Sequence, residues 1–554
     1  MKRTLSLVLV LAMMLTAMLG VVSFADAVPA AQTPTLVVSD ASLEFANSVY
    51  LYVAVDYSAL GSSDGVTLKI TNNKTGKSVV LKPTNAVTPP VNCVAFKFVD
   101  LGASNMGDQL TIQALKDGVA NGEAKTYSVL EYALKAQAQG DAKLTNLMKA
   151  MLQYGRDAQI LMNHTGTYDL SKDYSLVKVG GIGSVNGQNK ALVALGSPVT
   201  ATASASDAVW YNAAIQRQGT GASFVVNTSK TYQSIYALPA TAANSEEYEL
   251  DMDKYTGNGG EYYGYLNEQS KMKTGFQAHN GVGGETTDSV GWFSGSFANT
   301  ALNSDGSPLS KIVVQKGYIM WAPATGINFN SSYVTKAIGE SVSAYATAVV
   351  NGTSTERLNN VVSLSITMAA DGDTAGIISR WHLRKGGTGS INTTNASTYD
   401  GTSSKPGRLH LFQAYGTTIK TIYKPAADNT VSATSGSAKP IVTLPKGESG
   451  KPGEFVTFHV VIDLSGTETC PGCNGSGLGS DNKACAACGG DGLANTIKYY
   501  VGESTSPVAI VANPAPMAFF KDIGSGYMNG ESGTSIGYLK AFTVTNGNIT
   551  DYFK

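Results

Sequence analysis

The chain has 554 residues, with 40 basic and 41 acidic side chains and a net charge of −1. This balance excludes bulk electrostatic attraction to nucleic acid or to anionic membranes, so neither is an expected partner. Only 15% of the residues are charged, against about 25% in an average globular protein. Glycine and small polar residues take their place, which is typical of turn-rich β structure with an uncharged polar surface.

Residues 1–27 are expected to be a secretory signal peptide. Lys2 and Arg3 precede an almost wholly apolar run from 4 to 22, and Ala25-Asp26-Ala27 supplies the small residues of a cleavage site. A retained membrane anchor is the alternative, because the apolar run is long enough for a bilayer. No second apolar span follows. The mature chain is therefore expected to have no membrane span and to be secreted or associated with the cell surface.

Residues 35–170 are predicted to form a small β-sandwich and a helical hairpin. Several period-2 segments between 48 and 118 predict strands, whereas 128–139 and 142–164 place apolar residues at helical spacing. The second helix is expected to pack on the sandwich; a partner-binding helix is the alternative. Strands followed by "YSVLEYALKAQ" and "LMKAMLQYGRDAQ" resemble an N-terminal module of many secreted proteins of Gram-positive anaerobes. That resemblance implies an extracellular accessory domain.

From about residue 175 onward the chain alternates short strand-like segments with Ser, Gly, Asn and Thr loops, which predicts large β-sandwiches. "FVTFHVVIDLSG", "NTIKYYVGE" and "IGYLKAFTVTNGNIT" resemble the closing strands of laminin-G and concanavalin-A-like jelly rolls, with His459, Tyr500 and Gly502 in the matching order. The resemblance implies a sandwich over 351–554, and 175–350 is either a second sandwich or continuous with it. The expected fold class is mainly β: a small N-terminal β-sandwich with a helical hairpin, then one or two large jelly-roll β-sandwiches with a four-cysteine loop insert.

The insert, residues 468–494, contains Cys-x-x-Cys-x-Gly-x-Gly twice, and its cysteines are Cys470, Cys473, Cys485 and Cys488. Each Cys-x-x-Cys pair brings two thiolates toward one ion, and the glycines permit a tight turn around the sulfurs. Four thiolates would complete a structural Zn²⁺ site with no open position for water. Two disulfides, in one of three pairings, and a redox-active pair are the alternatives.

The same repeat resembles the zinc domain of DnaJ-family co-chaperones. The chain lacks a J-domain with its His-Pro-Asp signature, so the resemblance implies metal ligation by the four cysteines and no co-chaperone activity.

Three acidic residues are the catalytic candidates. Glu249, Asp251 and Asp253 share one face of a predicted strand, and they resemble the Glu-x-Asp-x-Glu strand of jelly-roll endoglucanases, which holds a nucleophile and a general acid. Asp253 is one methylene shorter than the expected glutamate, and acids on a solvated strand face are the alternative. Residues 533–537 match the spacing of a Gly-x-Ser-x-Gly elbow, but they lead into a strand and predict a turn.

Aromatic side chains are the candidates for sugar binding, because ring faces with polar tips suit pyranose recognition. They are Tyr262, Tyr263, Tyr265, Trp292, Trp321 and Trp381. Core burial is the alternative for each tryptophan. Ca²⁺ is a further candidate ion, at the short acidic loops 371–373 and 305–306, where a plain turn is the alternative.

These patterns predict a secreted or cell-surface binding or adhesion protein without catalytic activity, which recognises a polysaccharide or a cell-surface glycan. One alternative is a jelly-roll glycoside hydrolase that uses the carboxylates of 249–253. Another is a structural protein of the cell surface without a small ligand, for which self-association is expected.

Overall fold

The computed structural model describes residues 34–45, 49–90, 92–139, 141–243, 249–251, 253, 260–263, 293–295, 311–315, 318–322, 328–329, 332–337, 361–372, 377–384, 408–415, 417–421, 439–485, 490–512, 522–525, 528–529 and 537–553. The chain divides into two compact units. The N-terminal unit runs to residue 179 and adds 184–202 and 223–235, and the C-terminal unit holds 180–183, 203–222 and 236–554. The domain boundaries expected at 175 and 351 stay predictions.

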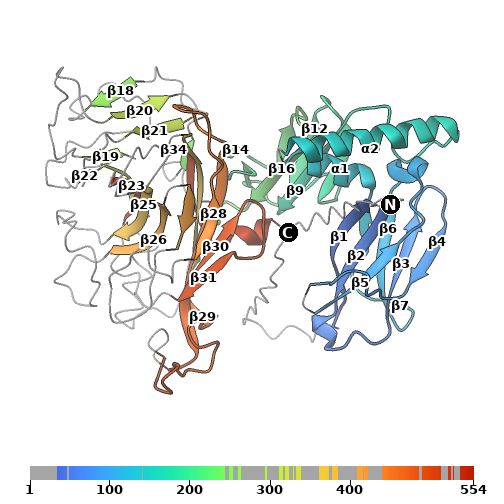
Figure 1. Cartoon of the computed structure of the whole chain (residues 1–554), viewed down its shortest axis with the longest axis horizontal. Helices are drawn as coiled ribbons and strands as arrows, with labels where there is room; N and C mark the ends of the chain where they lie inside the picture. Colours follow the sequence, from blue (N-terminus) through green and yellow to red (C-terminus); the bar gives the residue numbers. More distant parts are fainter. Residues whose placement is uncertain are drawn as a thin grey trace, which may run out of the picture. The chain divides into compact units, whose positions relative to one another are not determined.

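The first part of the N-terminal unit contains two antiparallel sheets (Figure 1). Their strands are β1 (Val37–Phe45), β2 (Val49–Asp56), β3 (Val66–Asn72), β4 (Ser78–Leu81), β5 (Cys93–Phe98), β6 (Leu110–Lys116), β7 (Val119–Ala120) and β8 (Lys125–Tyr127). One sheet has the order β1-β2-β5 and the other β4-β3-β6-β7, with β8 also paired to β6. Alternate residues of β2 and β3 are buried in one shared core, as the period-2 pattern predicts.

A helical hairpin completes this core. It consists of α1 (Val129–Gln137) and α2 (Ala142–Leu161), which lie next to each other in Figure 1. Ser128 and Asp141 cap the two helices, since their side-chain oxygens accept hydrogen bonds from the backbone N–H groups of Glu131 and Leu144. Leu144, Met148 and Met151 of α2 are buried in the same core as the strands. The small sandwich with a helical hairpin is thus confirmed.

Residues 174–238 form strands that are divided between the two units. They are β9 (Tyr174–Gly181), β10 (Gly183–Ser184), β11 (Lys190–Ala194), β12 (Val199–Ala203), β13 (Val209–Asn212), β14 (Arg217–Thr220), β15 (Ser223–Val226) and β16 (Tyr232–Leu238). Among them, β9 pairs with β11, β12 with β15, and β13 with β14, all antiparallel.

The C-terminal unit is built mainly from two large sheets. Its strands are β17 (Glu249–Asp251), β18 (Gly260–Tyr263), β19 (Phe293–Gly295), β20 (Lys311–Gln315), β21 (Tyr318–Ala322), β22 (Asn328–Phe329), β23 (Ser332–Ala337), β24 (Val361–Ala370), β25 (Ile377–Arg384), β26 (Arg408–Tyr415), β27 (Thr418–Lys420), β28 (Pro440–Thr443), β29 (Val456–Thr469), β30 (Leu493–Val501), β31 (Ala509–Ala512), β32 (Asp522–Ser525), β33 (Met528–Asn529) and β34 (Gly537–Asn546). The larger sheet has the order β18-β20-β21-β34-β24-β29-β30-β31, with β17 on β34, and the other has the order β19-β23-β32-β25-β26-β27-β28.

The two large sheets pack against each other as a sandwich. Phe412 of β26 and Phe458 of β29 belong to different sheets, and their rings meet edge to face with centroids 4.9 Å apart. In the central strand β24 every residue after Val361 is buried, so both faces of this strand are covered. The mainly β fold class with large sandwiches is confirmed.

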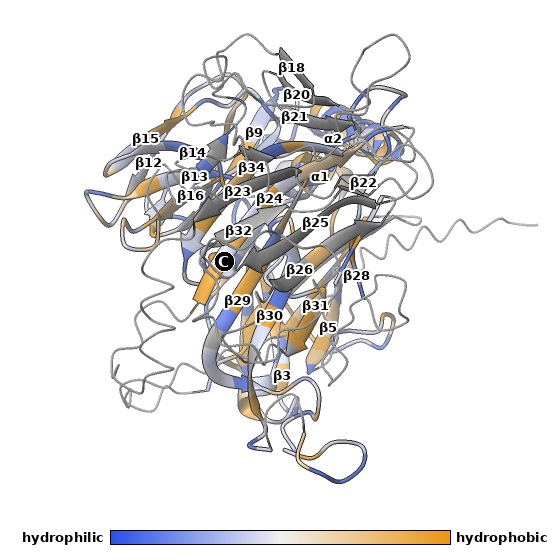
Figure 2. Cartoon of the chain, turned by 90° about the vertical axis from the view of Figure 1, so that its left-hand side faces the viewer, coloured by the Kyte–Doolittle hydropathy of each residue, from blue (hydrophilic) through white to orange (hydrophobic). Residues whose placement is uncertain are grey.

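One hairpin of the larger sheet extends beyond its neighbours. Strands β29 and β30 pair from Phe458↔Val501 to Asp463↔Thr496, and pairing resumes at Glu468↔Ala494. Residues 464–467 therefore lie opposite the single residue Asn495, so the first strand has an irregular bulge of several residues. Figure 1 shows the hairpin continuing past the sheet beyond this point, and Figure 2 shows hydrophobic residues in the bodies of its strands. Residues 470–485 and 490–492 of the four-cysteine segment lie at the tip.

Candidate metal centre

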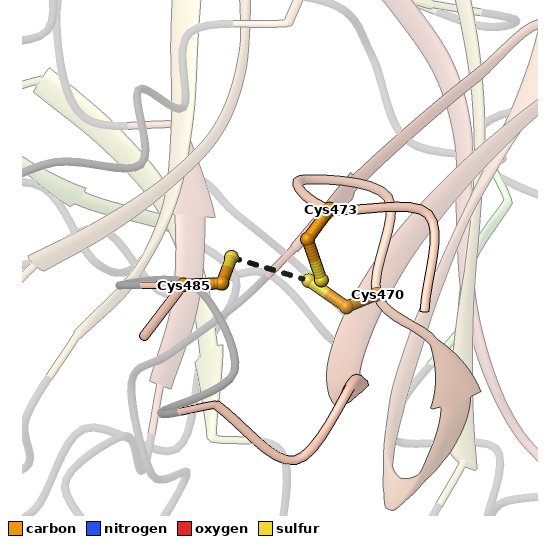
Figure 3. A group of neighbouring side chains, drawn as sticks. All are labelled: Cys470, Cys473 and Cys485. Carbon is orange, nitrogen blue, oxygen red and sulfur yellow. Dashed lines mark hydrogen bonds between the residues drawn. The ribbon is translucent and has the colours of Figure 1, made fainter. Parts of the chain in front are cut away.

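Three cysteines converge at the tip of the β29–β30 hairpin (Figure 3). The sulfurs of Cys470, Cys473 and Cys485 all lie within 4.8 Å of one another. The sulfurs of Cys470 and Cys485 are 3.9 Å apart. Cys470 and Cys485 are buried and Cys473 is half-buried. The fourth predicted ligand, Cys488, lies outside the described residues.

The two halves of the motif hold each other through the backbone. The N–H of Cys470 donates to the carbonyl of Gly492 at 2.8 Å, and the N–H of Cys485 donates to the carbonyl of Gly477 at 2.8 Å. Each half thus accepts, at its last glycine, a hydrogen bond from the first cysteine of the other half. This reciprocal pairing places sulfurs that are 15 residues apart in sequence beside one another.

The four motif glycines are needed both for conformation and for space. Gly475, Gly477, Gly490 and Gly492 have φ angles of 81°, 72°, 105° and 80°, in the left-handed region that other residues rarely adopt. A Cβ on Gly477 would lie 2.2 Å from the carbonyl oxygen of Gly490. A Cβ on Gly492 would lie 2.4 Å from the carbonyl oxygen of Gly475. Only glycine permits the two turns to approach this closely.

The sulfur positions fit a metal ion. The separation of 3.9 Å is almost twice the S–S bond length of about 2.05 Å. It is close to the sulfur–sulfur spacing of about 3.8 Å that follows from tetrahedral Zn–S bonds of about 2.3 Å. No disulfide joins Cys470, Cys473 and Cys485 to one another. Cys470, Cys473 and Cys485 could therefore hold a metal ion.

The hairpin tip has little hydrophobic packing of its own. Its large apolar side chains, Leu478 and Leu493, are 51% and 43% exposed. The buried cluster of the tip consists of Cys470, Cys485 and Ala494, with Cys473 packed against it. A metal at the sulfurs would thus supply the cohesion that apolar burial supplies elsewhere in the chain.

Of the predicted acidic residues, Glu249 is held in a polar network of the C-terminal unit. The Arg217 Nε–H donates to both carboxylate oxygens, at 3.0 and 3.1 Å. The Tyr211 hydroxyl donates to one of them at 2.8 Å. Burial, together with the nearby Glu249 charge, raises the pKa of Tyr211, so the phenol stays protonated and remains a donor. The side chains of Glu249 and Arg217 are both largely shielded from solvent.

The other two acids of β17 and its extension have partners as well. Asp251 accepts a hydrogen bond from the Gln216 amide at 2.8 Å, and Asp253 pairs with Lys540 at 3.3 Å. Gln216 and Arg217 follow directly on Ile215, a β-branched residue at φ 55°. Such a conformation is costly for a β-branched residue, and the Thr543 hydroxyl stabilises it by donating to the Ile215 carbonyl at 2.7 Å.

His459, near the start of β29, is fully buried and has a structural role. Its Nδ1 lies 2.9 Å from the Ser365 hydroxyl, and its Nε2 lies 2.9 Å from the Gly502 carbonyl. Burial lowers the pKa of His459 to about 4, which keeps the ring neutral at physiological pH. A neutral ring bonded on both sides is not available to a ligand.

The candidate sugar-binding residues are distributed over several segments. Tyr262 and Tyr263 belong to β18, Trp321 to β21 and Trp381 to β25, with their side chains outside the described part of the chain. Tyr265 and Trp292 lie wholly outside it. These assignments remain predictions.

The two candidate Ca²⁺ loops are described only in part. Asp371 is buried and accepts hydrogen bonds from the Tyr538 hydroxyl at 2.5 Å and from the Gly450 N–H at 3.2 Å. Asp373 and the 305–306 loop lie outside the described residues, as does most of the 533–537 turn.

No helix in the described part of the chain has both the length and the apolar character that a membrane crossing requires.

No protein-family model matches the sequence, and no curated protein matches it significantly. Among solved structures, the carbohydrate recognition domain of Emp46p is 11% identical, with 43% of this chain and 87% of that chain covered and a TM-score of 0.21. A putative beta-glucanase from Mycobacterium abscessus is 8% identical, with 55% and 96% covered and a TM-score of 0.22. The binding domain of botulinum neurotoxin DC, in complex with SialylT, is 7% identical, with 42% of this chain and 40% of that chain covered and a TM-score of 0.22. The present chain thus spans less than half of the length of that structure. Similarities this low assign neither a ligand nor an activity.

Proposed function

We propose that this chain is an extracellular binding protein without catalytic activity, in which a structural zinc ion holds the tip of the β29–β30 hairpin as a contact surface. The observation that carries the proposal is the convergence of Cys470, Cys473 and Cys485 on one point, across two halves that are joined by reciprocal hydrogen bonds.

In this proposal Cys488 is the fourth ligand, because it repeats in the second half the position of Cys473 in the first. Four thiolates favour Zn²⁺ and fill its tetrahedral shell, so the ion has no open position for a substrate and its role is structural. Binding of zinc to such peptides is worth about 10–16 kcal/mol at neutral pH, which is ample to order a loop without a hydrophobic core.

The contacts of the acidic strand support a role without catalysis. A glycosidase needs one carboxyl group that can give a proton and another that faces the sugar. Glu249 is instead largely buried beneath Arg217 and Tyr211, both of which donate to it. Asp253 forms an ion pair with Lys540, which also supports a structural role for this acid.

A glycan is the proposed ligand class. The surface is expected to carry few charges, and tyrosines outnumber phenylalanines by 27 to 16. Tyrosine presents a ring face and a hydroxyl together, which suits neutral polysaccharides. The signal-like segment 1–27 supports an extracellular location of the mature chain in this proposal.

The zinc site is tested by elemental analysis of the purified mature chain, together with thiol titration before and after chelation. We expect about one zinc per chain, with the hairpin thiols reactive only after the metal is removed. Cys470→Ser should abolish zinc retention, and Cys93→Ala, far from the hairpin in sequence, should leave it unchanged. A chain without metal whose hairpin cysteines form two disulfides would contradict the proposal.

The binding role is tested by co-sedimentation with insoluble polysaccharides, with an assay for released reducing sugar on the same samples. We expect retention without product for both the wild type and Glu249→Gln. Product release that disappears in Glu249→Gln would instead establish the hydrolase alternative.

A further inference from the structure

The outer face of α2 carries large apolar side chains that the core does not use. Leu147, Tyr154 and Leu161 are 37%, 65% and 84% exposed. They occur every seventh residue, and seven residues turn an α-helix to within about 20° of two full turns. The three side chains therefore follow one line along the helix, while Met148 and Met151 on another side are buried.

This line continues with small and charged residues at a regular spacing. Steps of four, three, four, three and four residues connect Lys143, Leu147, Ala150, Tyr154, Asp157 and Leu161, all of them exposed. Such alternation of three and four is the spacing with which one helix packs against another. The outer face of α2 thus has the pattern of a helix–helix seam, which we call the α2 seam.

Between Lys143 and Asp157 the α2 seam is complementary to itself. Lys143 and Asp157 each lie seven residues from Ala150, on opposite sides, which corresponds to about 10.5 Å along the helix. If two copies of α2 lie antiparallel with a two-fold axis beside Ala150, Lys143 of each copy faces Asp157 of the other. Leu147 then lies beside Tyr154 of the second copy. The small Ala150 side chain allows the two helices to approach closely where they cross.

The Asp157 carboxylate is oriented by hydrogen bonds from its own helix. The Gln153 amide lies 2.9 Å from both of its carboxylate oxygens, and the Arg156 guanidinium donates to one of them at 3.2 Å. The hydrogen bond from Gln153 lowers the pKa of the Asp157 carboxyl group. The side chain is thus a charged and oriented acceptor on the helix surface.

We propose that the α2 seam binds the α2 seam of a second copy of this chain, in an antiparallel pair with two-fold symmetry. An isologous contact of this kind closes on itself and gives dimers, not filaments. One helix face buries less than the roughly 800 Å² per partner of a standard interface, so the dimer is weak and depends on concentration. Independently of what the hairpin binds, a dimer would carry two hairpin tips, and two linked binding sites raise avidity for a repetitive surface.

Charge exchange tests the proposal. Sedimentation velocity of the mature, metal-loaded chain between about 1 and about 200 μM should show a monomer–dimer equilibrium. Lys143→Asp and Asp157→Lys each place like charges at both crossing contacts, so each variant alone should dimerise at least about tenfold more weakly. An equimolar mixture of the two variants should restore the dimer, because every charged contact in the mixed pair is again between opposite charges.

Lys149→Asp is the matched control. It makes the same charge change at an exposed position of α2, about 200° around the helix from Leu147 and away from the seam. It should leave the dimer unchanged, whereas Tyr154→Lys should abolish it, and circular dichroism checks that each variant is folded. A monomeric wild type over the whole range overturns the proposal in favour of a different partner for this face. A dimer that resists both charge exchanges, or a mixture that fails to restore it, also overturns the proposal.

Discussion

Acid should destabilise the C-terminal unit through His459. The ring is neutral in the folded protein, where burial lowers its pKa from 6.5 to about 4. In the unfolded chain the ring takes up a proton at its ordinary pKa. Below pH 6.5 the unfolded state therefore binds more protons than the folded state, so the free energy of unfolding falls as the pH decreases. The stability that a neutral His459 provides is complete above pH 6.5 and is lost progressively as the pH falls toward 4.

The size of this effect follows from the two pKa values. At about 1.36 kcal/mol per pH unit, the whole interval between them corresponds to about 3 kcal/mol. Between pH 7 and pH 5, before most carboxylates titrate, His459 alone should lower the free energy of unfolding by about 2 kcal/mol.

Denaturant unfolding at pH 7, 6 and 5 measures this loss, with His459→Gln as the comparison. Glutamine can still bond to Ser365 and to the Gly502 carbonyl, but it does not titrate. Other groups titrate equally in both proteins, so the difference between their pH dependences isolates the ring. If wild type and His459→Gln lose the same free energy between pH 7 and pH 5, the assignment of a neutral, buried His459 is wrong.

Three further substitutions test other parts of the structure. Gly477→Ala forces a Cβ to 2.2 Å from the Gly490 carbonyl oxygen at a positive φ, a strain of about 1–3 kcal/mol, so zinc retention in a chelator competition should weaken about 10- to 100-fold. A Cβ on Gly479 would lie 3.1 Å from the end of the Asp481 side chain and 3.6 Å from the Lys483 carbonyl oxygen, an ordinary contact, so Gly479→Ala should bind zinc as the wild type does. Met148→Ala removes a fully buried side chain from the N-terminal core, so it should lower the free energy of unfolding by about 2–5 kcal/mol, measured by thermal unfolding. A decrease below about 0.5 kcal/mol would show that this side of α2 is not packed. Asp141→Ala removes the N-cap of α2 and should cost about 1 kcal/mol, whereas Asp141→Asn, which can still cap, should cost far less.

The hairpin tip was accessible from sequence because its geometry is local. Each Cys-x-x-Cys-x-Gly-x-Gly unit specifies its own turn, and the positive φ angles of the four glycines occur at the positions that the motif requires. What the spacing did not show is that the halves interlock crosswise, with Cys470 bonded to Gly492 and Cys485 to Gly477. That contact depends on how the two turns meet in space.

The surroundings of the acidic strand show where sequence patterns stop being informative. The alternation of acids at 249–253 predicted a shared face, but no pattern linked Glu249 to Arg217, 32 residues earlier. Arg217 and Gln216 reach the acids because the preceding residue, Ile215, is held in the left-handed region by Thr543, 328 residues away. Local propensity argues against this conformation for isoleucine, so only the folded sandwich could reveal it.

Strand β29 shows a similar limit for period-2 reasoning. Val460, Val461 and Ile462 are buried in succession, because both faces of this strand are covered by other parts of the chain. A strict alternation of inward and outward residues fails there, and the burial of His459 on one of these faces could not be inferred from the pattern.

The way in which the hairpin tip joins the sheet makes the tip a structurally independent insertion. The chain enters at Thr469 and leaves at Leu493, which are paired with each other, and the irregular bulge at 464–467 separates this pair from the continuous ladder of β29 and β30. Replacing residues 470–492 by a short turn would therefore leave the ends of both strands where they are. By the same geometry, the excised segment carries its own sulfurs and glycines and could be transplanted to the end of another antiparallel hairpin as a metal-dependent module.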